Sequence, residues 1–120
     1  MKKRIMIVDD SPITTRQLQG ILEKAGHTIV KTASSGLDAI KTYNENMADI
    51  DLVTLDITMP TMPGTRVLEL IMEKNPTAKV IMVSAIGKDS VIKECLKNGA
   101  RHFIVKPFEE KRILEVMKAI

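Results

Sequence analysis

The sequence predicts an α/β fold in which one parallel β-sheet carries helices on both faces. Short apolar runs rich in β-branched residues alternate about five times with amphipathic stretches long enough to form helices. The connections are short, and strands joined through helices pair in parallel. Because such crossovers are right-handed, a doubly wound five-stranded sheet is the natural closure.

The first strand and helix are expected at the N-terminus. Residues Arg4 to Val8 (RIMIV) form an apolar run typical of a buried strand. Ser11 and Pro12 then form an N-cap and first-turn pair. The helix should end at Ala25-Gly26. Its expected apolar stripe consists of Ile13, Leu18, Ile21 and Leu22.

The middle of the chain predicts two more strand and helix pairs. Thr28 to Thr32 alternates like a short strand, and Ser34 to Gly36 opens the helix after it. Asp51 to Leu55 is an apolar run of strand type, and the helix that follows should end at Asn75-Pro76. The apolar residues of these two helices are Leu37, Ile40 and Tyr43, then Val67, Leu68, Leu70 and Ile71.

The last third repeats the pattern twice. Lys79 to Val83 is the fourth expected strand, and the helix after it should end at Asn98-Gly99. His102 to Val105 is the fifth strand, ahead of a final helix. The apolar residues of these helices are Val91, Ile92, Cys95 and Leu96, then Ile113, Leu114, Val116 and Met117. We interpret Cys95 as a core or boundary residue.

Composition limits the function. The 120 residues, 44% hydrophobic and 28% charged, fit a single domain over residues 1–120. The net charge of +3 is scattered, and aromatic residues make up 2%, so we expect no nucleic-acid partner. No signal peptide or membrane span is recognisable, which leads us to expect a cytoplasmic protein without a membrane partner.

Polar side chains follow four of the five expected strands. Because the carboxyl ends of parallel strands meet at one edge of the sheet, where ligands bind, these side chains should gather there. They are Asp9, Asp10, Asp56, Ser84 and Lys106. Crowded carboxylates repel one another and need a cation, and Mg²⁺ suits oxygen ligands together with a phosphate. With a hydroxyl and an ammonium beside them, they predict phosphoryl transfer onto a carboxylate.

A structural role is the alternative for each residue. Asp56 could cap a turn, Ser84 could bind a backbone group, and Lys106 could form a salt bridge on an acidic rim. Phe103 could be an ordinary core residue.

The residues in this order resemble the receiver domain of bacterial response regulators, most of all the stand-alone chemotaxis regulators. The resemblance spans the whole chain. It rests on Asp9-Asp10, Asp56 with Met59-Pro60 and Gly64, Ser84-Ala85, and Lys106-Pro107-Phe108. It implies a flavodoxin-like fold with strand order 2-1-3-4-5.

The resemblance also implies roles for the residues. Asp56 would accept a phosphoryl group from a histidine kinase, and Lys106 would hold that group. Mg²⁺ would bind Asp10, Asp56 and the backbone carbonyl of Thr58 directly, and Asp9 through water. Ser84 and Phe103 would form the switch, and Lys106-Pro107 would be a cis peptide bond.

The expected output partner binds the face formed by the fourth helix, fifth strand and fifth helix, and the flagellar motor switch is one such partner. The protein would be a monomer in chemotaxis control. It would catalyse its own phosphorylation and slow dephosphorylation without being a turnover enzyme.

Three positions depart from the family pattern. Thr58 and Ile86 stand where fast-hydrolysing members carry Asn or an acid, so we predict a long-lived phosphorylated form. Pro63 replaces the usual Asp or Asn and should stiffen its loop.

Other functions fit less well. A flavodoxin-type phosphate or flavin site would need a Ser, Thr or Gly-rich loop where this chain has Asp9-Asp10-Ser11-Pro12. A phosphatase would need a further acid or base, and the Asp49-Ile50-Asp51 pair precedes its strand. The receiver half of a longer regulator, and a degenerate receiver that binds partners without phosphate, remain alternatives.

Overall fold

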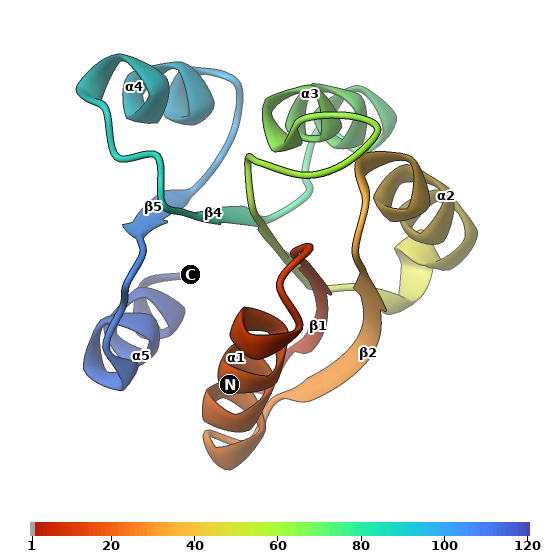
Figure 1. Cartoon of the computed structure of the whole chain (residues 1–120). Helices are drawn as coiled ribbons and strands as arrows, with labels where there is room; N and C mark the ends of the chain where they lie inside the picture. The colour runs from red at the N-terminus through yellow and green to blue at the C-terminus, as the bar shows by residue number, and fades with distance from the viewer. Residues whose placement is uncertain (1) are drawn as a thin grey trace.

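The structure is a computed structural model that describes residues 2–120. Five parallel strands form one sheet in the order β2-β1-β3-β4-β5 (Figure 1), which confirms the predicted fold class. The strands are β1 (Arg4–Val8), β2 (Thr28–Ala33), β3 (Leu52–Leu55), β4 (Val80–Ser84) and β5 (His102–Val105).

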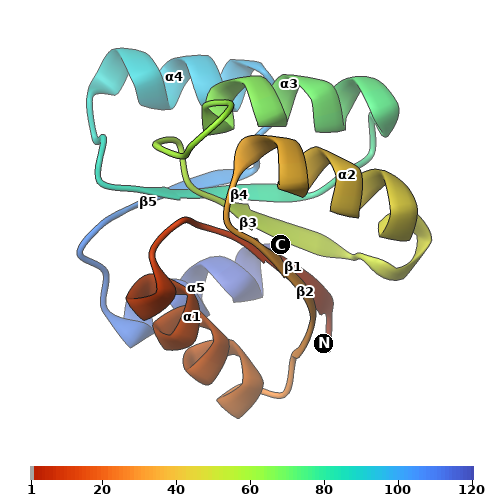
Figure 2. The same cartoon turned by 45° about the vertical axis from the view of Figure 1, so that its right-hand side comes forward.

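Helices cover both faces of the sheet. Figure 2 shows α2, α3 and α4 on one face and α1 and α5 on the other. The helices are α1 (Pro12–Lys24), α2 (Gly36–Asn46), α3 (Gly64–Lys74), α4 (Asp89–Lys97) and α5 (Glu110–Ala119), with a short 3-10 turn, η1 (Met47–Asp49), after α2. None of the helices in residues 2–120 is long and apolar enough to cross a membrane.

Each face of the sheet has its own apolar core. On the α2, α3 and α4 side, Met6, Leu55 and Met82 pack with Leu68 and Cys95. The core on the α1 and α5 side contains Ile5, Ile7, Leu18, Leu22, Ile81, Val83, Ile104 and Ile113. Strands with both faces covered read as continuous apolar runs, which is why β1, β3 and β4 were recognisable in the sequence.

Helix α1 begins as expected but buries less of its stripe than expected. The Ser11 side chain accepts a hydrogen bond from Thr14 N, 3.2 Å away, and caps the helix. Leu18 and Leu22 are buried, whereas Ile13 is 78% exposed. The prediction was wrong for Ile13 because, at 3.6 residues per turn, it lies about 140° around the helix from Leu18 and about 180° from Leu22, on the face turned away from the core.

Candidate functional site

Strand register sets the positions of the two central carboxylates. Val8 of β1 lies opposite Leu55 of β3, so the residues that follow them, Asp9 and Asp56, leave the sheet side by side. Asp56 N donates to Val8 O at 3.0 Å, which continues the ladder one step beyond the strands. Both side chains are buried. The sequence therefore delivers two carboxylates to one point at the carboxyl edge of the sheet.

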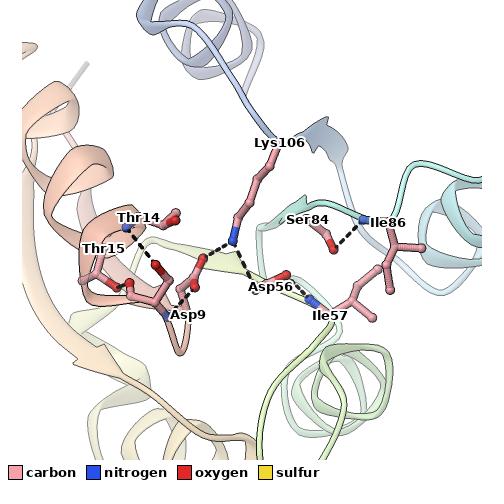
Figure 3. Close-up of polar contacts among 9 residues, drawn as sticks. Asp9, Thr14, Thr15, Asp56, Ile57, Ser84, Ile86 and Lys106 are labelled. Carbon is pink, nitrogen blue, oxygen red and sulfur yellow. Dashed lines mark hydrogen bonds and ion pairs between the residues drawn. The ribbon is translucent and has the colours of Figure 1, made fainter.

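Lys106 connects these two carboxylates. It follows β5, and its Nζ donates to Asp9 Oδ2 at 2.7 Å and to Asp56 Oδ2 at 3.1 Å (Figure 3). The Lys106 side chain is largely shielded from solvent, so these charge-assisted bonds are not strongly screened. The peptide bond between Lys106 and Pro107 is cis.

Burial and ion pairing shift the pKa values of Asp9 and Lys106 in opposite directions. Burial raises the pKa of the Asp9 carboxyl, while hydrogen bonds from Lys106 and from Ser11 N limit that rise. Burial alone would lower the pKa of Lys106, but its bonds to Asp9 and Asp56 outweigh burial and raise it. Lys106 is therefore a permanent positive charge at neutral pH.

Three carboxylates meet here and leave an excess of negative charge. Oxygen atoms of Asp9, Asp10 and Asp56 all lie within 4.8 Å of one another, and Asp10 is exposed whereas the others are buried. One ammonium cannot neutralise three carboxylates. An all-oxygen donor set with residual negative charge fits a hard divalent cation such as Mg²⁺. Thr58, whose carbonyl the resemblance assigns to the metal, lies exposed two residues after Asp56.

Ser84 lies at the carboxyl end of β4, on the neighbouring strand to Asp56 (Figure 3). It is buried, and its hydroxyl accepts a hydrogen bond from Ile86 N at 3.2 Å. Lys106 N donates to Ser84 O at 2.9 Å, so the backbone links Ser84 to the lysine. The hydroxyl oxygen has a local backbone partner, and its proton is available to a new acceptor.

Phe103 lies on β5, three residues before Lys106, and is half-buried. Its ring packs against the core on the α2, α3 and α4 side and also lines a surface hollow with Val105 and Phe108. The structure thus places it between the core and the surface.

The loop after Asp56 is held close to β3. One Asp56 oxygen, Oδ1, accepts from Ile57 N at 2.7 Å, and Gly64 N donates to Ile57 O at 2.7 Å. Thr61 has a φ of 69°, a left-handed value that is rare for a β-branched residue, and its hydroxyl accepts from Leu37 N at 3.1 Å. The loop is therefore attached to α2 as well as to β3.

The Asp49 and Asp51 pair lies away from this site. Asp51 is at the opposite end of the sheet, where its carboxylate accepts hydrogen bonds from Arg4 N, Nε and Nη2. The side chains of Asp49 and Arg4 approach to 3.7 Å. These acids form ion pairs at the start of β1 and β3, with no part in the cluster around Asp56.

Two details of the site were not predicted. A salt bridge of Lys106 on the acidic rim was the alternative to a phosphoryl contact, but Asp9 was not identified as its partner, and the bond from Ile57 N to Asp56 was not foreseen. The first joins residues 97 positions apart and the second depends on a side-chain rotamer. No signal in the sequence reports either of them.

Comparison with known proteins places these features in a family. Residues 5–118 match the response regulator receiver domain. Chemotaxis protein CheY of Listeria monocytogenes is 44% identical over 115 residues, covering 96% of this chain and 95% of that protein. Chemotaxis protein CheY of Thermotoga maritima is 41% identical over 120 residues, covering 100% and 98%.

A solved structure is also similar. It is the CheX-CheY-BeF3-Mg complex of Borrelia burgdorferi, in which the matching chain has a TM-score of 0.95 and 45% identity. The match covers 98% of this chain and 88% of that one.

Proposed function

This chain belongs to the response regulator receiver domain family, and from that premise we propose that it is a two-component signalling switch that accepts a phosphoryl group on Asp56 and acts in chemotaxis. The observation that carries the choice of Asp56 is the Lys106 ammonium, 3.1 Å from Asp56 Oδ2 and 2.7 Å from Asp9 Oδ2. The ammonium is shared with Asp9, but Asp56 is the one of the two acids at the tip of the central strand, and a positive charge there is suited to holding the phosphoryl oxygens.

In the proposed reaction an oxygen of Asp56 attacks phosphorus, and the bond to the donor breaks. With a phosphohistidine of a kinase, the P–N bond is lost and the imidazole leaves as the new P–O bond forms. Lys106, already held by Asp9, keeps a positive charge where the phosphoryl oxygens arrive. Catalysis then consists mainly of positioning and charge neutralisation, so the chain performs its own phosphorylation and slow dephosphorylation without being a turnover enzyme.

Magnesium belongs to this proposal. Asp10 and Asp56 would hold the ion with the carbonyl of Thr58, and Asp9 would contact it through water. When bound, Mg²⁺ neutralises negative charge on the transferred group. The cluster of carboxylate oxygens within 4.8 Å supports this assignment, as does the name of the Borrelia complex, which includes magnesium.

Phosphorylation would act through Ser84. The new group adds nearly two negative charges beside a hydroxyl whose proton is available. Ser84 would turn from Ile86 N toward the phosphoryl oxygens, and Phe103 would move inward into the space left. The output surface in this proposal is the face of α4, β5 and α5, where Val105 is exposed. The chain would act as a monomer, and a cytoplasmic partner such as a motor-switch protein would bind this face.

The chemistry is tested by intact-mass spectrometry after incubation with acetyl phosphate. We expect a gain of one phosphoryl group that requires Mg²⁺ and is absent in Asp56→Asn. Asp89→Asn, which removes an exposed acid of α4, is the matched control and should still be phosphorylated. No gain under any condition would favour a degenerate receiver that binds partners without phosphate.

The switch is tested by amide chemical shifts. Phosphorylation should shift the signals of α4, β5 and α5 in the wild type, and the shifts should be reduced in Ser84→Ala. The same shifts without phosphate, or none with it, would contradict the proposed switch.

A further inference from the structure

The edge of the sheet farthest from Asp56 contains a pocket of about 370 Å³. It lies where β1, β3 and β4 begin, at the ends of the strands that point away from the acidic cluster. Its walls include Lys3, Tyr43, Asp51, Asn75 and Lys79. The proposed phosphorylation chemistry uses none of these residues.

Lys3 is the unusual member of this pocket. It is only 7% exposed, and within residues 2–120 its ammonium has no salt bridge and no hydrogen-bond acceptor. Only its backbone groups form hydrogen bonds: the N–H donates to His27 Nδ1 at 3.0 Å, and the carbonyl accepts from Thr28 N at 3.0 Å. The stem of the side chain is covered, whereas the ammonium is not among the fully buried polar atoms of residues 2–120 and reaches the solvent of the pocket that Lys3 lines.

Tyr43 presents a second unpaired donor. The residue is 2% exposed, and its hydroxyl oxygen accepts from Asn75 Nδ2 at 3.1 Å. Within the described part of the chain no acceptor receives the hydroxyl proton. A buried phenol normally donates as well as accepts. The wall therefore offers two donors without an acceptor in the described part of the chain, the ammonium of Lys3 and the hydroxyl of Tyr43.

The other charges of the pocket make it positive. Lys2 and Lys79 also line it, while the single acid of the wall, Asp51, already accepts three hydrogen bonds from Arg4. Arg4 thereby offsets most of the charge of Asp51, which also interacts with Lys3, so the three lysines leave the wall with a net positive charge. This set of charges and donors favours an anion that accepts several hydrogen bonds.

We propose that this pocket binds the phosphate group of a small phosphorylated molecule. Lysine ammonium groups are compact point charges that suit a tetrahedral oxyanion. The ammonium of Lys3 and the hydroxyl of Tyr43 would donate to the phosphate oxygens from inside the pocket, while Lys2 and Lys79 would contribute from its rim. The volume lies at the low end of the range for small-molecule sites, so it accommodates a phosphate with a small organic group.

The test is a titration with inorganic phosphate and with pyrophosphate, followed by amide chemical shifts. Magnesium is left out so that the anion cannot bind with the metal at the acidic cluster, and sodium chloride at equal ionic strength is the salt control. We expect saturable shifts at Lys3, Leu52, Thr77 and Lys79. Lys3→Met should weaken binding at least tenfold, whereas Lys111→Met, an exposed lysine of α5, should leave it unchanged.

Folding of the variants is followed by thermal melting. Lys3→Met keeps most of the buried stem and removes a lone charge, so it should melt no lower than the wild type. Phosphate should raise the melting midpoint of the wild type and not that of Lys3→Met. Tyr43→Phe, which removes only the hydroxyl, should weaken phosphate binding severalfold.

Three results would overturn the proposal. They are shifts that sodium chloride reproduces, shifts centred on Asp56 and Lys106, and equal affinities of the wild type and Lys3→Met. None of them affects the assignment of Asp56, because acetyl phosphate labelling measures the other end of the sheet.

Discussion

Gly64 lies directly against the backbone of Asp56: a β-carbon added to Gly64 would overlap the carbonyl oxygen of Asp56. Gly64 is also the first residue of α3, and its N–H donates to Ile57 O at 2.7 Å. The loop between β3 and α3 therefore folds back onto the end of β3, next to Asp56. Only glycine permits this approach, since the obstructing atoms are backbone atoms that cannot rotate away.

Gly64→Ala is expected to move the loop and destabilise the protein. The added methyl group should cost about 3 kcal/mol of the free energy of unfolding, because the backbone of Asp56 and Ile57 must shift. Phosphoryl acceptance should fall with it. Urea unfolding and acetyl phosphate labelling measure the two effects. Gly20→Ala is the control, since no atom lies within 4 Å of a β-carbon there. It should instead stabilise α1 by about 0.5 to 1 kcal/mol.

Thr54→Val is expected to stabilise the protein. Thr54 Oγ1 is the one buried side-chain polar atom in residues 2–120 that lacks a hydrogen-bond partner. Its strand neighbours, Ile7 and Ile81, belong to the apolar core on the α1 and α5 side. Replacing the hydroxyl with a methyl group should add about 1 kcal/mol to the free energy of unfolding. Thr54→Ala, which also leaves a cavity, should show no such gain in urea unfolding.

The sequence predicted the fold well because residues within each strand and helix, or at its ends, identify that element. Apolar runs between turn residues indicated the five strands, and the Ser11 cap located the start of α1. What failed was the expected burial of Ile13 in α1. Ile13 is 78% exposed because, at 3.6 residues per turn, it lies about 140° around the helix from Leu18 and about 180° from Leu22. An approximate apolar stripe therefore overstated the buried face, and the strict helical period would have placed Ile13 outside it.

The sequence predicted which residues gather at the site, but it did not predict the contacts among them. Parallel strands bring Asp9 and Asp56 to one edge of the sheet whatever rotamers their side chains adopt, so their proximity followed from the fold. The bond between Lys106 and Asp9 did not, because rotamers and the path of the β5–α5 connection decide it. The pocket around Lys3 was not predicted either. Lys3 reads as part of a solvated basic terminus, and only the packing of β1 against β2 and β3 shows that it is buried.

Mg²⁺ is expected to stabilise the wild type through Asp10. The ion relieves repulsion among carboxylates that lie within 4.8 Å, and at ten times its Kd it should add about 1.4 kcal/mol to the free energy of unfolding. Asp10→Asn removes one of the three charges. This variant should melt higher than the wild type without Mg²⁺ and respond little when the ion is added. Asp89→Asn should keep the full response in the same thermal scan, and a full response in Asp10→Asn would contradict the assignment.

Acid is expected to destabilise the protein through His27. Burial lowers the pKa of His27 below its ordinary value of 6.5, and the nearby charge of Lys3 lowers it further. The Nδ1 atom accepts a hydrogen bond from Lys3 N, which a proton on that atom would break. Between pH 6.5 and the lower pKa of the folded state the unfolded chain binds more protons. The contribution of His27 to stability is therefore complete above pH 6.5 and declines as pH falls below it.

The measurement for His27 is urea unfolding at pH 5, 6 and 7. His27→Asn offers a side-chain oxygen that can accept from Lys3 N but does not titrate in this range. The wild type should lose stability relative to this variant as pH falls from 7 to 5. His102→Asn, which retains His27 and its hydrogen bond, should show the same loss as the wild type. Parallel pH profiles of the wild type and His27→Asn would refute the prediction.

The phosphorylated form is expected to be long-lived because of Thr58 and Ile86. Thr58 lies exposed two residues after Asp56, and Ile86 packs partly buried against the core two residues after Ser84. Neither side chain has an amide or acid that would orient a water molecule toward the acyl phosphate. Thr58→Asn with Ile86→Glu should shorten the lifetime severalfold, as followed by intact mass after acetyl phosphate is removed. Thr58→Ala with Ile86→Ala controls for lost packing without adding an amide or an acid. If the Asn and Glu variant decays as slowly as the wild type, these two positions do not set the lifetime.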